Sequence, residues 1–271
     1  ENEMDYAGEL AKGVDIYVNN AFGASHRNHA SVVGITKIVP VSVAGMLLKK
    51  EMEYLSMAMD EAVDDFVLIL GGAKVSDKIP VINNLIDKVS TILIGGAMSY
   101  TFLKTKGIKV GKSMVEDDYI PMCSKILKKA EGKNVEVLLP VDHIAAIKVE
   151  PNVTIRMIHR GEDIPEEMMG LDIGMETINV FSREIQKAKV IVWNGPMGVF
   201  EVDDFSAGTV EIARAVSRST ATSIVGGGDS VSALHKAGVA QDISHISTGG
   251  GASLEFLSGK TLPGIAALLS K

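Results

Sequence analysis

The residues best suited to chemistry lie in a glycine-rich turn after a short apolar run. Residues 71–78 read GGAKVSDK, and the two glycines would let a ligand approach the backbone closely. We expect this segment to open a helix, so that Lys74 and Lys78 share one face of its first turn. Two cations at the positive end of a helix are unfavourable unless an anion lies between them. The spacing therefore favours anion binding over two solvated surface lysines, although it is not that of a Walker A loop.

Two other glycine-rich turns have the same character. Residues 226–230 read GGGDS. Here Asp229 could hold Mg²⁺ and Ser230 could bind phosphate, but either residue could equally well cap the following helix. Residues 248–253 read TGGGAS. The backbone N–H groups of this turn could stabilise charge developing on a phosphoryl group, and a purely structural tight turn is the alternative.

Two weaker candidates carry charge without regular spacing. Residues 193–201 read WNGPMGVFE, in which Glu201 would accept hydrogen bonds from ribose hydroxyls or remain an exposed loop carboxylate. Residues 26–29 read HRNH, and the Arg27 guanidinium suits bidentate recognition of phosphate or carboxylate. Taken alone, an exposed polar loop explains either segment better than a ligand site does.

The elements that must hold these turns follow a repeated pattern. Short β-branched runs end in glycine clusters and are followed by helical patterns, as at 66–72, 91–96, 190–195 and 222–228. Runs that are apolar on both faces are typical of strands covered by helices on two sides. We therefore expect an α/β fold with an open parallel sheet and helices on both faces. Ligands should bind beyond the carboxyl ends of the strands, where the glycines lie.

The chain before residue 63 is expected to form a separate part. A strand at 16–18 leads to a polar, basic loop, and apolar residues recur with helical spacing from Ser42 to about residue 62. We expect Ser42 to cap this helix and the helix to bridge two lobes. Residues 1–41 would then be the remnant of a second α/β lobe.

Composition limits the possible partners. A net charge of −7 argues against nucleic acid, because a phosphate backbone needs a broad basic face. Cys123 is the sole cysteine, so the chain can form no internal disulfide, and a cytoplasmic location is expected. No apolar run approaches the length of about 20 residues that a membrane helix needs.

Five motifs, taken together and in order, resemble those of the phosphoglycerate kinase family: DIYVNNAFG with HR shortly after it, then GGAKVSDK, WNGPMGVFE, GGGDS and STGGGASLE. The resemblance runs from about residue 11 to the C-terminus. It implies phosphoryl transfer between 1,3-bisphosphoglycerate and ADP, giving 3-phosphoglycerate and ATP, with Mg²⁺ as cofactor. It also implies a monomer of two lobes, joined by a long helix, that close like a hinge on the substrates.

The resemblance also implies roles for individual residues. The catalytic residues would be Lys74, Gly250 and Gly251, which contact and cradle the transferred phosphoryl group. Phosphoglycerate would bind at Gly23 and Arg27. The residues that would bind the nucleotide, with Asp229 also holding the metal, are Gly72, Ala73, Lys74, Lys78, Gly170, Asn194, Pro196, Glu201, Gly227, Gly228, Asp229 and Ser230.

Most of the family's N-terminal lobe would precede residue 11. We therefore expect a lobe remnant at 1–41, an interdomain helix at 42–62, a nucleotide-binding lobe at 63–253 and a returning C-terminal segment at 254–271. Because the absent part carries charge-stabilising arginines in the family, this polypeptide should bind Mg-nucleotide but catalyse poorly or not at all. The apolar side chains of the C-terminal segment should have little to pack against, which would leave exposed apolar surface there, a disordered start and end of the chain, or partners that fill the gap.

The sequence is compatible with two other functions. A non-catalytic adenine-nucleotide-binding fragment would keep every residue above except a working Arg27. A Rossmann-type oxidoreductase would also have parallel strands and glycine turns. It is disfavoured because no G-x-G-x-x-G follows the first strand with an acidic residue about 20 positions further on.

Overall fold

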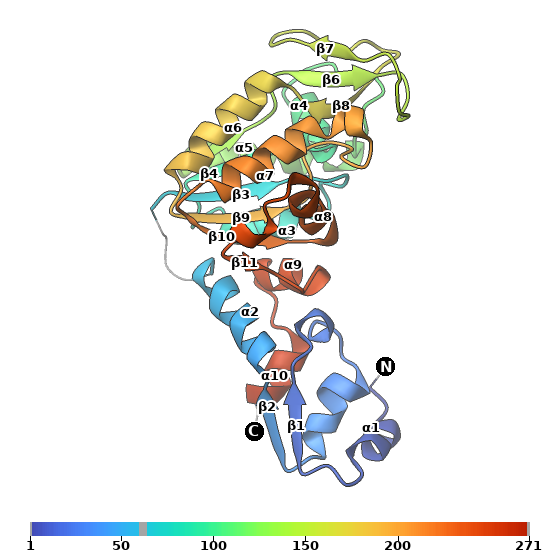
Figure 1. Ribbon diagram of the computed structural model, residues 1–271, viewed down its shortest axis with the longest axis vertical. Helices are drawn as coiled ribbons and strands as arrows, with labels where there is room; N and C mark the ends of the chain where they lie inside the picture. The colour runs from blue at the N-terminus through green and yellow to red at the C-terminus, as the bar shows by residue number, and fades with distance from the viewer. Residues whose placement is uncertain (1, 60–63, 270–271) are drawn as a thin grey trace. The chain divides into compact units, whose positions relative to one another are not determined.

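The computed structural model describes residues 2–59 and 64–269. These residues form two compact units, one made of 2–59 with 247–269 and the other of 64–246. Figure 1 shows how their elements follow one another along the chain. Among the described helices, none combines the length and apolar character that crossing a membrane requires.

The larger unit is built on a six-stranded sheet in which all neighbours are parallel. Across the sheet the order is β11-β10-β9-β3-β4-β5. The chain thus adds strands outward from β3 in one direction and outward from β9 in the other, and the order reverses between these two neighbours. The strands are β3 (Phe66–Leu70), β4 (Thr91–Ile94), β5 (Glu136–Leu138), β9 (Val190–Asn194), β10 (Thr222–Gly226) and β11 (His245–Ile246).

Helices cover the sheet, which confirms the predicted fold class. They are α3 (Ile79–Leu85), α4 (Met98–Thr105), α5 (Ile120–Gly132), α6 (Met175–Lys187), α7 (Ala207–Ser217) and α8 (Gly228–Ala237). Helices α6, α7 and α8 pack side by side (Figure 1), and Phe181 and Leu234 from them share one core with Ile69 and Trp193 of the sheet. Because parallel crossovers are right-handed, the connections through α3, α4 and α5 lie on the opposite face.

The apolar runs of the sequence have a simple physical origin. Every residue of β3, β4 and β9 is buried. Helices on two faces leave these strands no side that meets water, so an alternating polar pattern would bury polar groups at a cost. For this reason the apolar runs in the sequence correctly predicted the central strands.

The structure also contains a second sheet, of three antiparallel strands, which the sequence analysis did not predict. Strand β6 (His143–Ala146) pairs with β7 (Arg156–Ile158) and with β8 (Met169–Ile173). Two of the three residues of β7 are exposed, so it shows neither a two-sided apolar run nor a clear alternation. This sheet affects function because β8 carries Gly170, one of the predicted site residues.

The smaller unit contains two strands that pair in parallel, β1 and β2. Its elements are α1 (Met4–Ala11), β1 (Ile16–Asn19), β2 (Val41–Ala44), α2 (Met46–Met57), α9 (Gly251–Leu257) and α10 (Pro263–Leu269). Shorter helical turns complete both units at Phe22–Ala24, Ala30–Gly34, Ile35–Lys37, Asp117–Tyr119, Asp203–Phe205 and Ala240–Asp242.

The predicted start of the bridging helix is wrong. Ser42 lies in β2, and α2 begins at Met46. The side chain that caps α2 is Asn20, whose Oδ1 accepts the N–H of Leu47 at 2.7 Å. Pairing with β1, which a local pattern does not reveal, turns residues 41–44 into a strand. The predicted end near residue 62 lies outside the described residues.

The C-terminal segment packs against the start of the chain, which contradicts the expectation that its apolar side chains have little to pack against. Leu257 and Leu262 are buried. The N–H of Gly264 also donates to the carbonyl of Ser25 at 2.8 Å. Leu269, at the end of α10, is exposed, and a further group of exposed apolar side chains lies on one face of β1 and β2: Ile16, Val18, Val41 and Val43.

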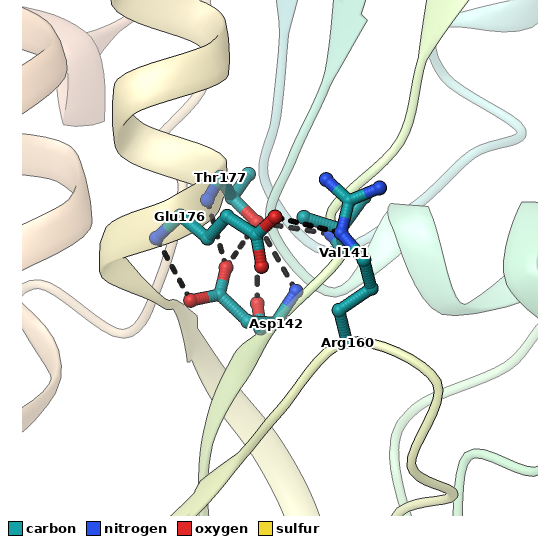
Figure 2. A network of polar contacts seen from close by, with 5 residues as sticks. All are labelled: Val141, Asp142, Arg160, Glu176 and Thr177. Carbon is teal, nitrogen blue, oxygen red and sulfur yellow. Dashed lines mark hydrogen bonds and ion pairs between the residues drawn. The ribbon is translucent and has the colours of Figure 1, made fainter.

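Asp142 fastens helix α6 to the loop before β6 (Figure 2). Its carboxylate oxygens accept the N–H groups of Glu176 and Thr177, at 2.9 and 2.8 Å, in the first turn of α6. The Thr177 hydroxyl accepts the N–H of Val141 at 2.9 Å, and Arg160 forms an ion pair with Glu176 at 2.7 Å. Asp142 is therefore a helix cap supplied by a distant part of the chain.

We expect Asp142→Ala to lower the free energy of unfolding by about 1–3 kcal/mol, because buried N–H groups lose their acceptor. Urea unfolding followed by circular dichroism measures the change. Glu150→Ala removes an exposed carboxylate paired with Lys148 and is the control, with an expected effect within about 0.5 kcal/mol. Equal losses in the two variants would show that Asp142 contributes no more than a surface charge.

Candidate functional site

A cavity of about 290 Å³ lies in the larger unit where glycine turns meet at the carboxyl ends of β3, β4 and β9. The cavity adjoins the point at which the strand order reverses between β3 and β9. In open parallel sheets the connections leave this point toward opposite faces, so a crevice forms between them. Six of the predicted residues line the cavity: Gly72, Ala73, Gly170, Pro196, Glu201 and Asp229.

Lys74 and Lys78 do not share a helix face, contrary to the prediction. Helix α3 begins only at Ile79, and residues 73–78 form irregular turns. The Lys74 side chain is exposed, whereas Lys78 is only 8% exposed. Pro80 lies in the first helical turn, where its missing N–H needs no partner, and this favours a start beside Pro80.

Lys78 extends toward the end of β9. Its ammonium donates a hydrogen bond to Oδ1 of Asn194, and Nδ2 of Asn194 donates to the carbonyl of Gly226 at 2.8 Å. Burial lowers the pKa of Lys78 below its ordinary value, while the charges of Asp77 and Asp229 oppose that shift. The predicted residues Lys78 and Asn194 thus form one contact that places a positive charge at the end of the sheet.

The GGGDS turn leads directly into α8. Ser230 is fully buried, and its hydroxyl accepts the N–H of Gly195 at 2.7 Å. The hydroxyl therefore ties the turn after β10 to the turn after β9. Gly227 has a φ of +95°, which glycine adopts without strain, and Gly228 begins the helix.

Asp229 is exposed at the edge of the cavity. Within residues 2–59 and 64–269, no three His, Cys, Asp or Glu side chains gather into a metal site. Mg²⁺ ordinarily binds proteins through one or two carboxylates, and phosphates and waters supply the other ligands. A single carboxylate beside the cavity therefore fits Mg²⁺ that arrives with a phosphate ligand.

Tyr100 and Gly96 line the cavity but were missed from the sequence. Gly96 follows β4 as Gly72 follows β3, so the rule that placed ligands after glycine-ended strands could have found it. Tyr100 is buried, with its hydroxyl 3.5 Å from Nδ1 of His143. A Cβ at Gly170 would overlap the Tyr100 ring, so glycine at this position lets the ring form the cavity wall. No local pattern marked Tyr100.

Asp172 is a buried residue next to the loop after β9, which lines the cavity. Its carboxylate oxygens accept the N–H groups of Gly208 at 2.7 Å and Ile173 at 2.9 Å, and the residue is 1% exposed. Burial raises the pKa of Asp172 to about 7, although these two hydrogen bonds oppose the rise. A Cβ at Gly198 would overlap this carboxyl, so the loop after β9 packs directly on Asp172.

In the smaller unit, the turn at 248–253 packs against the AFG segment after β1. A Cβ at Gly249 would overlap the Phe22 ring, and one at Gly23 would lie 3.3 Å from the carbonyl oxygen of Thr248. Glu51 of α2, which is fully buried, accepts both the N–H and the hydroxyl of Thr248 at 2.7 Å. Sequence reasoning missed Glu51, because one acidic residue in an amphipathic helix carries no signal of its own.

The two predicted catalytic glycines lie in this turn. Gly250 has a φ of +48°, and Gly251 begins α9. The side chain of His26 lies near Gly251, whereas Arg27 is exposed. The smaller unit thus brings together the glycine turn and the basic segment that are far apart in the sequence.

The larger unit combines an apolar slot with nearby charge. The slot between Gly170, Tyr100 and the loop after β9 suits a flat apolar ring. Lys78 and the first turn of α8 suit an anionic group, and Asp229 suits a cation carried by that group. An adenine ring linked to a metal-bound phosphate chain has this combination of features.

Comparisons with known proteins give a consistent family match. The family model described as phosphoglycerate kinase matches residues 1–260. The phosphoglycerate kinase of Koribacter versatilis is 56% identical over 272 residues, covering 100% of this chain and 68% of that protein. The one from Clostridium tetani is 52% identical over 271 residues, covering 100% of this chain and 67% of that protein.

Solved structures give the same result. The structure of phosphoglycerate kinase from Coxiella burnetii has a TM-score of 0.93 at 40% identity, covering 99% of this chain and 69% of that chain. The crystal structure of the enzyme from Pyrococcus horikoshii has a TM-score of 0.86 at 34% identity, with coverages of 99% and 69%. The match therefore extends over both units described here.

We expect Asp172→Asn to reduce the pH dependence of stability. Because the folded-state pKa of Asp172 is raised to about 7, its stabilising contribution is present below its unfolded pKa, near 4, and is lost as pH rises through 7. Between about pH 5 and about pH 7.5 the unaltered chain should lose about 1–3 kcal/mol more unfolding free energy than the variant. Urea titrations at the two pH values measure this, and parallel losses would contradict it.

Proposed function

Because this chain belongs to the phosphoglycerate kinase family, we propose that it transfers a phosphoryl group between 1,3-bisphosphoglycerate and ADP, giving 3-phosphoglycerate and ATP. The observation that supports this most directly is the cavity at the β3–β9 reversal, with Lys78 and Asp229 beside it. An acyl phosphate is already activated, so the protein's tasks are alignment, exclusion of water and neutralisation of charge.

The nucleotide would bind in the larger unit, with its base in the apolar slot beside Gly170. Glu201 would accept hydrogen bonds from the ribose hydroxyls. Lys78 and the first turn of α8 would meet the phosphates, and Asp229 would be the protein ligand of Mg²⁺, which neutralises phosphate charge when bound. The other residues proposed to contact the nucleotide are Gly72, Ala73, Lys74, Asn194, Pro196, Gly227, Gly228 and Ser230.

Residues of each unit are assigned a role in the transfer step. We assign contact with the transferred phosphoryl group to Lys74, whose exposed side chain follows the cavity residue Ala73. Gly250 and Gly251 would cradle a phosphoryl group in transfer with their backbone. Gly23 and Arg27 would bind phosphoglycerate, because the guanidinium can pair with a phosphate through two hydrogen bonds.

The 271-residue polypeptide spans about two thirds of the length of these relatives, 68% for the one from Koribacter versatilis. We propose that this polypeptide by itself binds Mg-nucleotide and catalyses slowly. Neutralising charge on a phosphoryl group in transfer is worth several orders of magnitude in rate, and Arg27 is the one arginine assigned to the reaction here. The second candidate function, a non-catalytic nucleotide binder, shares the cavity but excludes turnover.

We expect Lys78→Met to weaken MgADP binding about tenfold, because a charge-assisted contact to phosphate is worth roughly 1.5 kcal/mol. Isothermal titration calorimetry on the 271-residue chain measures this. Lys109→Met, which removes an exposed lysine paired with Asp163, is the matched control and should bind like the unaltered chain. A well-folded chain that gives no heat with MgADP would overturn the proposed function.

A turnover assay separates the two candidate functions. We expect slow ATP formation from 1,3-bisphosphoglycerate and MgADP, lowered at least about tenfold further by Arg27→Met, since the substrate loses a bidentate contact. Coupled detection of ATP with purified chain provides the measurement. MgADP binding with no turnover above the Arg27→Met background would favour the non-catalytic binder.

A further inference from the structure

Residues 72–76 form the irregular loop that carries Lys74, and the main chain holds its near end. The N–H of Gly72 donates to the carbonyl of Pro196 at 2.8 Å, and the carbonyl of Gly72 accepts the N–H of Met98 at 3.0 Å. Lys74, two residues further on, is exposed. These hydrogen bonds fix where the loop starts but leave the direction of Lys74 to whatever holds the far end.

Glu116, from a distant part of the chain, holds that far end. Its Oε2 accepts the N–H of Ser76 at 3.0 Å, and its Oε1 accepts the Ser76 hydroxyl at 2.7 Å. The main chain of Val75 also hydrogen-bonds to Glu116. Burial raises the pKa of Glu116, but these hydrogen bonds and the charge of Lys74 outweigh it and lower the pKa below its ordinary value. The Glu116 carboxylate, called the clamp below because it holds the far end of the loop, is therefore ionised at neutral pH.

Glu116 is itself fixed to helix α4. Its N–H donates to Oγ1 of Thr101 at 3.1 Å, and Thr101 is buried. The next residue, Asp117, forms an ion pair with Lys104 at 2.7 Å. Met98, whose N–H donates to the carbonyl of Gly72 at the near end of the loop, is the first residue of the same helix. Both ends of the loop are thus held relative to α4, and the cavity residue Tyr100 lies on that helix as well.

We infer that Glu116 is a positioning residue for phosphate binding, which fixes the backbone at Val75 and Ser76 so that Lys74 is held ready for the phosphate chain. Without the clamp, the ligand would have to order the loop itself, and that ordering reduces affinity. Hydrogen bonds from backbone N–H groups to a carboxylate are stronger than those between neutral groups. The inference rests on the proposed function, and it adds a residue that the family motifs did not indicate.

The test compares ligands with and without phosphates. Calorimetry on the full 271-residue chain gives dissociation constants for MgATP and for adenosine. We expect Glu116→Gln to raise the value for MgATP about tenfold and that for adenosine less than about twofold, because the amide nitrogen replaces an acceptor of the Ser76 contacts. Ser76→Ala, which removes only the hydroxyl contact, should act in the same direction with a smaller effect. Asp118→Asn, on an exposed carboxylate two residues further along the chain, is the control and should leave the ratio unchanged.

A double-mutant cycle tests whether Glu116 acts through Lys74. In a Lys74→Met background, Glu116→Gln should raise the dissociation constant for MgATP by less than about twofold, since the group that it positions is gone. A purely structural role predicts a lower melting temperature with equal losses for both ligands, and that result would overturn the inference. Full additivity of the effects of Glu116→Gln and Lys74→Met on the dissociation constant for MgATP would also overturn the inference. If the unaltered chain binds no MgATP, the proposed function fails and this inference fails with it. Normal binding by the unaltered chain and an unchanged ratio in Glu116→Gln would overturn the inference alone.

Discussion

The reversal of strand order between β3 and β9 is the constraint on which the rest of the larger unit depends. Two parallel strands side by side end at the same edge, and their connections leave toward opposite faces. The glycine turns after them can therefore face each other across a crevice without filling it. The backbone contact between Gly72 and Pro196 joins the two turns at this point, so the cavity is bounded by main chain that side-chain motion does not easily change.

Polar contacts between turns give this edge its chemistry. Lys78 reaches Asn194, Ser230 reaches the backbone after β9, and Asp172 receives the first turn of α7. Each of these groups is buried, so each contact must be kept or a polar group is left without a partner, which costs free energy. The same contacts that stabilise the fold therefore hold the proposed binding groups in place.

In the smaller unit, too, contacts that stabilise the fold hold proposed binding groups in place. Its contacts group residues 247–269 with the start of the chain, so the turn with Gly250 and Gly251 belongs with Gly23 and Arg27. Glu51 holds this turn through Thr248, in the way that Glu116 holds the loop before α3. In both units a carboxylate from a distant helix or turn binds backbone N–H groups of a glycine-rich loop, which are the groups such a loop leaves unpaired.

The sequence by itself determined the strand–glycine–helix repeat, the parallel sheet and most of the segments that carry the candidate site. It could do so because burial on two faces leaves an apolar run and a turn that approaches a ligand leaves glycines, and both traces are local. Tertiary structure alone decided that Ser42 joins a strand and that Lys78 is buried while Lys74 is exposed. It also decided that Tyr100 lines the cavity and that Glu116 holds the loop at Ser76. These outcomes depend on partners far away in the chain, such as β1 for Ser42 and Asn194 for Lys78, and a local pattern contains no information about which distant residues the fold brings together.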